Sequence, residues 1–316
     1  MGKTARRRNA VRNCAASGPP EGETPWIGSR TCGILFLQNG ADNRRLERKK
    51  MNTPYEIPDL HYQFGETEQH LFPTVLFGKN DIVLVDCGYP GSLFLLEEQL
   101  CAHAIEPGAL TKLVLTHQDD DHIGAAAEWK ERCPDLQILA SCAEAPYPSG
   151  DRKDLRLQQG EALQPQLPEE QRAFGEQFCE RYRNLNTISV AFLLRDGDRF
   201  DWGDGCEIIA TPGHTPSHIS IRSLDNEYMI TGDAAVLEGR QPAIANPEFC
   251  LDRKEAQHPL ERIAHFQYRR YICYHGGVLD RQQPVPPARN REPSFAGMPT
   301  KRADFCAKER TLLEKP

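Results

Sequence analysis

Short apolar runs alternate with amphipathic stretches along the chain from Pro54 to about residue 280. Runs of Val, Ile and Leu that end in Gly, Asn or Asp are typical of buried strands. Such runs occur at residues 74–78, 81–88, 112–117 and 136–141, and then in SVAFLL, CEIIATPGH, HISIRS, YMITGDA and YICYHGG. Lys79 and Asn80 separate the first two runs, which predicts a hairpin between them.

Between several of these runs, apolar residues recur with the spacing of an amphipathic helix. It predicts helices over residues 92–104, 123–133 and 168–185, and over 253–270 with a break or kink at Pro259. Strands therefore come in runs with helices between them, and the sequence contains no repeat of 20–50 residues. This pattern predicts an α/β protein with two packed sheets or one large mixed sheet.

Charge divides the chain into a body and two ends, while the overall composition, 39% hydrophobic and 26% charged over 316 residues, is that of a globular protein. Residues 1–50 carry 11 Lys and Arg against 4 Asp and Glu, and residues 281–316 carry 8 against 4. The middle holds the other 19 basic and 37 acidic residues, a net charge of −18. We predict a basic, disordered extension at 1–50, a folded domain at 51–280 and a basic, Pro-rich, disordered tail at 281–316.

The chain has few signals for a membrane or for export. No stretch approaches the roughly 18 apolar residues of a membrane helix, and the apolar run at residues 33–37 is too short for a signal peptide. None of the eleven cysteines is spaced as C-x-x-C, so a cysteine-ligated zinc is not expected. We predict a cytoplasmic protein without a membrane partner.

Residues that can bind metals follow the predicted strands. They are, in chain order, Asp86, His117, His214, Asp233 and His275. Because the carboxyl ends of strands meet at one edge of a sheet, we expect these side chains to converge. The segment from His117 to His122, HQDDDH, crowds three carboxylates that repel one another unless cations offset their charge. Imidazole and carboxylate together suit zinc, manganese or iron.

Four segments in the order THQDDDHIG, TPGHTPSHIS, TGD and CYHGG resemble the metallo-β-lactamase-fold hydrolases, and the resemblance covers about residues 55–280. It implies a four-layer αββα sandwich with a site for two divalent metal ions, zinc foremost, at one edge. It implies that the first ion is bound by His117, Asp119 and His214, the second by Asp121, His122 and His275, and that Asp233 bridges them. The family's first motif is H-x-H-x-D-H, so Asp119 stands where the family usually has a histidine. Because a carboxylate is a harder ligand than imidazole, manganese and iron stay alternatives to zinc.

Several other polar residues receive supporting roles. The resemblance implies that Asp86 lies behind the metal site and that the polar insert at residues 143–187 shapes the substrate pocket. His218 matches no ligand position, so we expect it to be structural. Asp120 is expected to face solvent or to cap the following helix.

These residues predict a hydrolase. Water shared by two cations ionises near neutral pH, and the same cations polarise a carbonyl, while Asp121 orients the hydroxide or passes its proton to the leaving group. The chain has no G-x-S-x-G serine motif. The family resemblance suggests a small ester, thioester or lactone as substrate. Two alternatives stay open: a metal-binding sensor without turnover, and a nucleic-acid-processing enzyme, which the net charge of −18 over residues 51–280 disfavours.

Overall fold

The computed structural model describes residues 53–64, 66–247, 250–265 and 268–281. All of them fall within one of the two units of the chain, Asn39–Pro316. The predicted extension at 1–50 and, apart from Arg281, the predicted tail lie outside the described residues, so the division into three segments stays a prediction. Within the described ranges, no helix is long and apolar enough to cross a bilayer.

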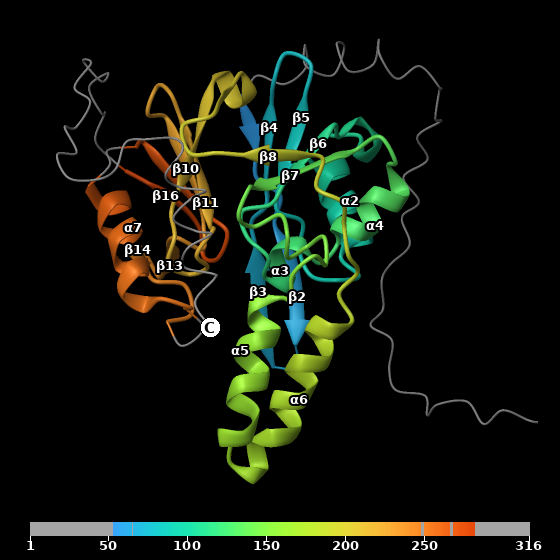
Figure 1. The fold of residues 1–316 in the computed structure, drawn as a ribbon. Helices are drawn as coiled ribbons and strands as arrows, with labels where there is room; N and C mark the ends of the chain where they lie inside the picture. Colours follow the sequence, from blue (N-terminus) through green and yellow to red (C-terminus); the bar gives the residue numbers. More distant parts are fainter. Residues whose placement is uncertain (1–52, 65, 248–249, 266–267, 282–316) are drawn as a thin grey trace, which may run out of the picture. The chain divides into compact units, whose positions relative to one another are not determined.

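The first sheet is built from the N-terminal half of the domain (Figure 1). Its strands, in spatial order, are β1 (Tyr55–Glu56), β4 (Thr74–Phe77), β5 (Ile82–Val85), β6 (Lys112–Val114), β7 (Gln137–Ser141) and β8 (Phe192–Leu194). Strands β1, β4 and β5 are antiparallel neighbours, whereas β5, β6, β7 and β8 run parallel. The hairpin predicted at Lys79 and Asn80 is confirmed, because Phe77 pairs with Ile82 across it.

The second sheet is built from the C-terminal half. Its strands, in spatial order, are β16 (Gly277–Asp280), β15 (Arg270–Cys273), β12 (Tyr228–Gly232), β11 (Ile219–Ser223), β10 (Cys206–Ala210) and β9 (Arg199–Phe200). All neighbours in this sheet are antiparallel except β12 and β15, which run parallel. Two hairpins stand apart from the large sheets, β2 (Leu60–Phe64) with β3 (Thr67–Leu71) and β13 (Val236–Glu238) with β14 (Gln241–Ala243).

The helices match the predicted intervals with three differences. They are α2 (Leu93–Ala102), α3 (Asp120–Ile123), α4 (Ala126–Arg132), α5 (Leu155–Leu163), α6 (Glu169–Arg183) and α7 (Arg253–His265), with 3-10 turns η1 (Pro107–Ala109), η2 (Gln164–Gln166) and η3 (Trp202–Asp204). The helix predicted over 123–133 is α4, which begins only at Ala126; the short helix α3 before it and the helix α5 were not predicted. Pro259 lies inside α7 without ending it, so of the break or kink predicted there the break is wrong.

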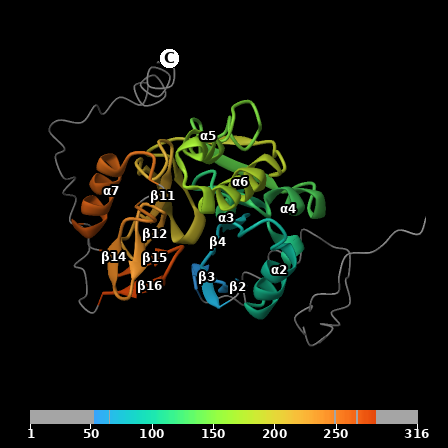
Figure 2. The ribbon, with the colours of Figure 1, turned by 90° about the horizontal axis from the view of Figure 1, so that it is seen from below.

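Four layers result from alternation along the strands. Leu76 and Val83 point into the core between the sheets, whereas their neighbours Val75 and Leu84 point outward, because successive side chains of a strand face opposite sides. The outer face of the first sheet packs against α2 and α4, and that of the second packs against α7 (Figures 1 and 2). Both faces of each sheet are thus covered, which is why the strands read as continuous apolar runs. The predicted αββα sandwich is confirmed.

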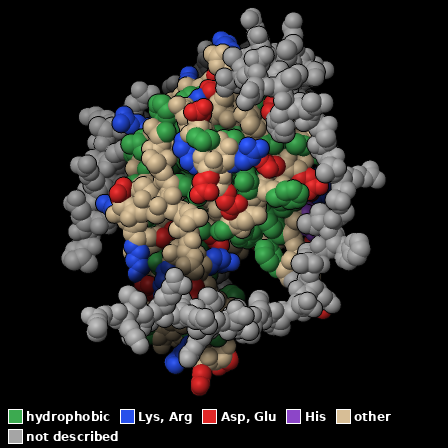
Figure 3. All heavy atoms as spheres, turned by 90° about the vertical axis from the view of Figure 1, so that its right-hand side faces the viewer, with side chains coloured by type: hydrophobic (Ala, Val, Ile, Leu, Met, Phe, Trp, Pro, Cys, Tyr) green, Lys and Arg blue, Asp and Glu red, His purple; other side chains and the backbone are tan. Residues whose placement is uncertain are grey.

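The surface beside α2 and α4 is chemically mixed. Figure 3 shows acidic and basic side chains interspersed with hydrophobic ones on this side of the molecule. Helices α5 and α6 pack against each other through Leu157, Cys179 and Tyr182, and lie beyond the ends of the strands next to α3 (Figures 1 and 2). The polar insert therefore covers the edge of the sandwich at which the HQDDDH segment lies.

Candidate metal centre

The fold brings the seven predicted metal-site residues to one edge of the sandwich. The HQDDDH segment follows β6 in the first sheet, while Asp233 follows β12 and His275 follows β15 in the second. His214 enters from the connection between β10 and β11. Loops from both sheets meet at this edge, because β6, β12 and β15 all end there.

The first group of predicted ligands is closely packed and buried. His117, Asp119 and His214 place their ligand atoms within 4.8 Å of one another. Oδ2 of Asp119 lies 2.9 Å from Nε2 of His214 and 3.4 Å from Nε2 of His117. This spacing is that of side chains arranged around one position.

The second group lies beside the first. Nε2 of His275 is 3.1 Å from Oδ2 of Asp121, and Nε2 of His122 is 3.8 Å from Oδ1 of the same carboxylate. Asp233 stands between the groups, since its Oδ1 lies 3.3 Å from His122 Nε2 and 3.4 Å from His275 Nε2, and its Oδ2 lies 3.4 Å from His214 Nε2. One carboxylate therefore faces both groups, which is the position that the resemblance implies for a bridging ligand.

The residues fit a metal, because several buried ligand atoms of the cluster lack hydrogen-bond partners among the described residues. Nε2 of His117, His122 and His275 and Oδ1 of Asp233 are buried and have no hydrogen-bond partner among the described residues. Buried polar atoms are rarely left unsatisfied, because desolvation without a partner is costly. Nitrogen and carboxylate oxygen in this arrangement are suitable ligands for a divalent transition metal.

Asp86 supports the site from behind, as the sequence predicts. It accepts hydrogen bonds from the backbone N–H and the hydroxyl of Thr116, both at 2.8 Å. Its Oδ2 also lies 2.8 Å from Nδ1 of His122. A carboxylate at Nδ1 holds the proton there and leaves Nε2 with its lone pair directed at the metal position.

His218 has the structural role that was expected. Its Nδ1 lies 2.8 Å from the hydroxyl of Thr211, and its Nε2 accepts a hydrogen bond of 2.9 Å from the backbone N–H of Asp233. Burial lowers the pKa of His218 well below its usual value, in keeping with a neutral acceptor. His218 therefore holds the chain at Asp233 in place.

Asp120 does not behave as predicted. Its side chain is buried rather than exposed, and the N-cap position of α3 belongs to Asp119. Asp120 accepts a hydrogen bond of 2.8 Å from the hydroxyl of Tyr182 and forms a 2.9 Å ion pair with Nε of Arg181, both from α6. Burial raises the pKa of Asp120 to about 6. The expectation failed because α6 folds over a loop that would otherwise face water.

Arg156 of α5 is a site residue that the sequence reading missed. Its Nε and Nη2 donate hydrogen bonds of 2.8 Å to the two oxygens of Asp119. Burial by itself would raise the pKa of Asp119, but Arg156 and His117 hold it well below its usual value. The crowding of carboxylates in HQDDDH indicates that a cation lies nearby. The sequence does not show that this cation is Arg156.

Neighbouring carboxylates raise the pKa values of two of the predicted histidine ligands. Burial would lower the pKa of His122, but Asp121 and Asp233 raise it well above its usual value. Burial would lower the pKa of His214 too, yet its hydrogen bond with Asp119 contributes to raising it to about 10. A metal must displace such protons, so its binding releases protons to solvent.

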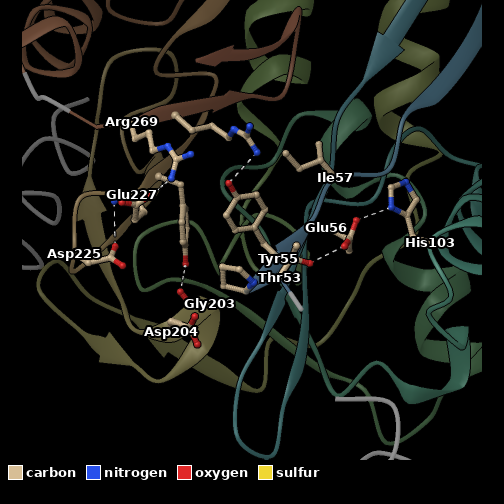
Figure 4. Close-up of a pocket in the computed structure, with 13 residues that line it drawn as sticks. Thr53, Tyr55, Glu56, Ile57, His103, Gly203, Asp204, Asp225, Glu227 and Arg269 are labelled. Carbon is tan, nitrogen blue, oxygen red and sulfur yellow. Dashed lines mark hydrogen bonds and ion pairs between the residues drawn. The ribbon is translucent and has the colours of Figure 1, made fainter. Parts of the chain in front are cut away.

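A separate cleft of about 450 Å³ lies at the opposite ends of the same strands (Figure 4). It is lined at Tyr228 and Arg270, where β12 and β15 begin, whereas the metal-site residues follow the ends of these strands. Its charged groups largely pair with one another, as in the 3.0 Å ion pair between Arg269 and Glu227. None of the seven predicted ligands lines this cleft.

Two packed sheets with a His and Asp cluster at the ends of their strands are the architecture of a metallo-hydrolase. Residues 73–275 match the sequence profile of the metallo-beta-lactamase superfamily, and the chain belongs to this superfamily. The resemblance noted in the sequence is thereby confirmed.

Individual relatives agree with this assignment. The probable metallo-hydrolase YflN of Bacillus subtilis (strain 168) is 30% identical over 165 residues, which are 50% of this chain and 56% of YflN. The chain spans about half the length of the curated relatives that it matches.

The metallo-beta-lactamase family protein TTHA1429 from Thermus thermophilus superposes with a TM-score of 0.52 at 20% identity, covering 72% of this chain and 75% of that one. The dizinc quorum-quenching lactonase AidC superposes with a TM-score of 0.50 at 15% identity, covering 70% and 78%. These two structures show the shared fold.

Proposed function

We propose that this protein is a metal-dependent hydrolase that acts on a small ester, thioester or lactone. One observation carries the proposal: buried atoms of His117, His122, Asp233 and His275, without hydrogen-bond partners in the described part of the chain, converge at the edge where both sheets end. The superfamily is one of metallo-hydrolases, and YflN is named a probable metallo-hydrolase. AidC is described as a lactonase, which makes a lactone one of the substrates to test.

The ligand atoms are those that zinc prefers, with manganese or iron as alternatives because Asp119 is a hard oxygen ligand. The two groups offer positions for as many as two ions. When bound, a divalent ion lowers the pKa of its water ligand toward neutrality and polarises a substrate carbonyl. This chemistry needs no serine or cysteine nucleophile.

Asp121 is the residue that we assign to proton transfer. Burial would raise its pKa, but His122 and His275 keep it below the usual value. Its backbone carbonyl accepts a hydrogen bond of 2.7 Å from the hydroxyl of Tyr274, and that hydroxyl accepts one of 3.0 Å from the N–H of Gly88. These hydrogen bonds anchor the backbone of α3 at Asp121, which supports a fixed position for its side chain.

The test measures metal content and turnover on the full chain. Elemental analysis of the purified protein is followed by assays with an aryl ester, a glutathione thioester and an acyl-homoserine lactone, before and after chelation and zinc addition. We expect chelation to abolish hydrolysis of at least one substrate and zinc to restore it. Full activity of the metal-free protein would contradict the proposal, and tight binding of every compound without turnover would favour a sensor.

A matched pair of histidine variants makes the test specific. His275→Ala removes a predicted ligand and is expected to lower activity at least 100-fold, on the order of what loss of a metal ligand costs. His258→Ala removes a histidine of α7 whose side chain is 60% exposed, and it should retain the activity of the unchanged protein. Equal activity of the two variants would show that the cluster is not the active site.

A further inference from the structure

The first group of predicted ligands already contains a cation that belongs to the protein. The side chain of Arg156 is 1% exposed, and its guanidinium makes two parallel hydrogen bonds of 2.8 Å to the oxygens of Asp119. Its Nη2 also lies 2.8 Å from Nε2 of His214. One guanidinium nitrogen is thus in contact with two of the three ligand atoms of this group.

Nε2 of His214, the nitrogen that faces Asp119, has no lone pair left for a metal in this arrangement. An imidazole nitrogen carries either a proton or a single lone pair. If Nε2 of His214 is protonated, it donates a hydrogen bond of 2.9 Å to Oδ2 of Asp119. If it is not protonated, its lone pair accepts a hydrogen bond of 2.8 Å from Nη2 of Arg156. In both states, binding of an ion by His214 requires that Arg156 or the proton leaves.

The second group differs because no arginine contacts its ligand atoms, although Nε2 of His117 in the first group also lacks a hydrogen-bond partner among the described residues. Nε2 of His122 and of His275 and Oδ1 of Asp233 lack hydrogen-bond partners within the described part of the chain. Among the residues that the structure describes, Asp121 and Asp233 form their ion pairs with histidines and with no arginine or lysine. The second group can therefore take up an ion without disrupting an existing contact with a fixed cation.

Removal of Arg156 from Asp119 would be costly. A buried, bidentate pair of arginine and carboxylate is among the stronger charged contacts in proteins. An ion that takes Asp119 from Arg156 leaves the buried guanidinium without its carboxylate partner and away from water. An ion at the first position must overcome this cost, whereas an ion at the second position need not.

We propose that Arg156 acts as a built-in cation at the first metal position, so that the protein binds one divalent ion tightly, through Asp121, His122, Asp233 and His275. A second ion binds the first group much more weakly. This inference rests on the metal dependence proposed above and specifies the number of ions.

The test is a zinc titration of the metal-free full chain against a chromophoric chelator of known affinity. We expect the unchanged protein to bind one ion tightly and a second at least about 100-fold more weakly, in line with the cost of breaking a buried ion pair. Arg156→Met should bind two ions, the second about 100-fold more tightly than in the unchanged protein. Two equally tight ions in the unchanged protein, or a single ion in Arg156→Met, would overturn the proposal.

Arg181→Met is the matched control. It removes an arginine that pairs with Asp120 of the same segment but not with a predicted ligand. Its second ion should bind as weakly as in the unchanged protein. If Arg181→Met and Arg156→Met strengthened the second ion equally, a general gain of negative charge would be the cause and the proposal would fail.

Two further variants keep the proposal testable if Arg156→Met does not fold. His275→Ala should weaken the tightly bound ion at least about 100-fold, whereas His214→Ala should change it less than about 3-fold. Equal weakening in both variants would contradict the inference. A failure of the proposed function has a different signature, because the unchanged protein would then bind no zinc at all or would bind it and hydrolyse no substrate.

Discussion

Oδ2 of Asp86 lies 2.8 Å from Nδ1 of His122, and this contact sets which nitrogen of the imidazole faces the metal position. Asp86 follows the end of β5, and His122 lies in α3, the short helix after β6, so the contact joins the ends of two neighbouring parallel strands. The backbone of Asp86 has a positive φ of 59°, which an aspartate adopts at a small cost. The tight turn at this strand end is thus part of the site's construction.

Asp86→Asn is expected to lower zinc affinity by about 10- to 100-fold with little change in fold, because outer partners of metal-binding histidines have effects of this size. A competition titration with a chelator measures it. Asp81→Asn is the control, since Asp81 pairs with Lys112 near the other end of β5. An Asp86→Asn protein with unchanged affinity would show that His122 is not oriented in this way.

Gly232→Ala should impair metal binding more than it impairs stability. Gly232 has a φ of +52°, and a Cβ there would lie 2.7 Å from Nε2 of His218, which holds the backbone of Asp233. We expect a loss of zinc affinity of at least about 10-fold. Gly239→Ala is the comparison, because Gly239 also has a positive φ, +65°, but nothing lies within 4 Å of its added Cβ. Similar zinc affinities for the two variants would refute this role of His218.

Glu144 makes stability depend on pH. Burial raises its pKa from 4.5 to about 8. Between these values the unfolded chain releases the proton while the folded protein keeps it, so the folded state binds more protons and its stability falls as pH rises. Below pH 4.5 both states are protonated, and above about pH 8 both are ionised.

Glu144→Gln is therefore expected to be more stable than the unchanged protein at pH 8, and to gain less or nothing at pH 5. Urea unfolding at both pH values measures the difference. Glu180→Gln, at an exposed position of α6, serves as the control. A Glu144→Gln protein that shows the same loss of stability between pH 5 and pH 8 as the unchanged protein would contradict the assignment.

Tyr182→Phe should loosen α6 from the HQDDDH segment. The hydroxyl of Tyr182 donates a hydrogen bond of 2.8 Å to the buried carboxylate of Asp120. Its removal leaves that oxygen with one partner fewer, which costs about 1–3 kcal/mol. Urea unfolding measures this loss. Tyr62→Phe, which removes a hydrogen bond of 2.7 Å to Ser92 at a half-buried position, should cost less, and an equal cost would argue against a special role for α6.

The strands and the convergence of the predicted ligands could be read from the sequence. Strands such as β5 are buried on both faces, so they appear as unbroken apolar runs that need no partner to be recognised. His117, Asp233 and His275 each follow such a run, and the carboxyl ends of strands meet at one edge by the geometry of the sheet. Local chemistry and chain geometry were sufficient at these positions.

The tertiary structure alone decided the surroundings of Asp119 and Asp120. Helices α5 and α6 are largely polar, and nothing within them shows that Arg156 and Tyr182 are buried while most of their neighbours face water. Their burial depends on how this helical pair docks on the edge of the sandwich, 37 residues or more along the chain from the carboxylates that they contact. The sequence thus determined which side chains can bind a metal, whereas the docking of two helices decided which of their charges are already neutralised, because that depends on contacts between segments far apart in the chain.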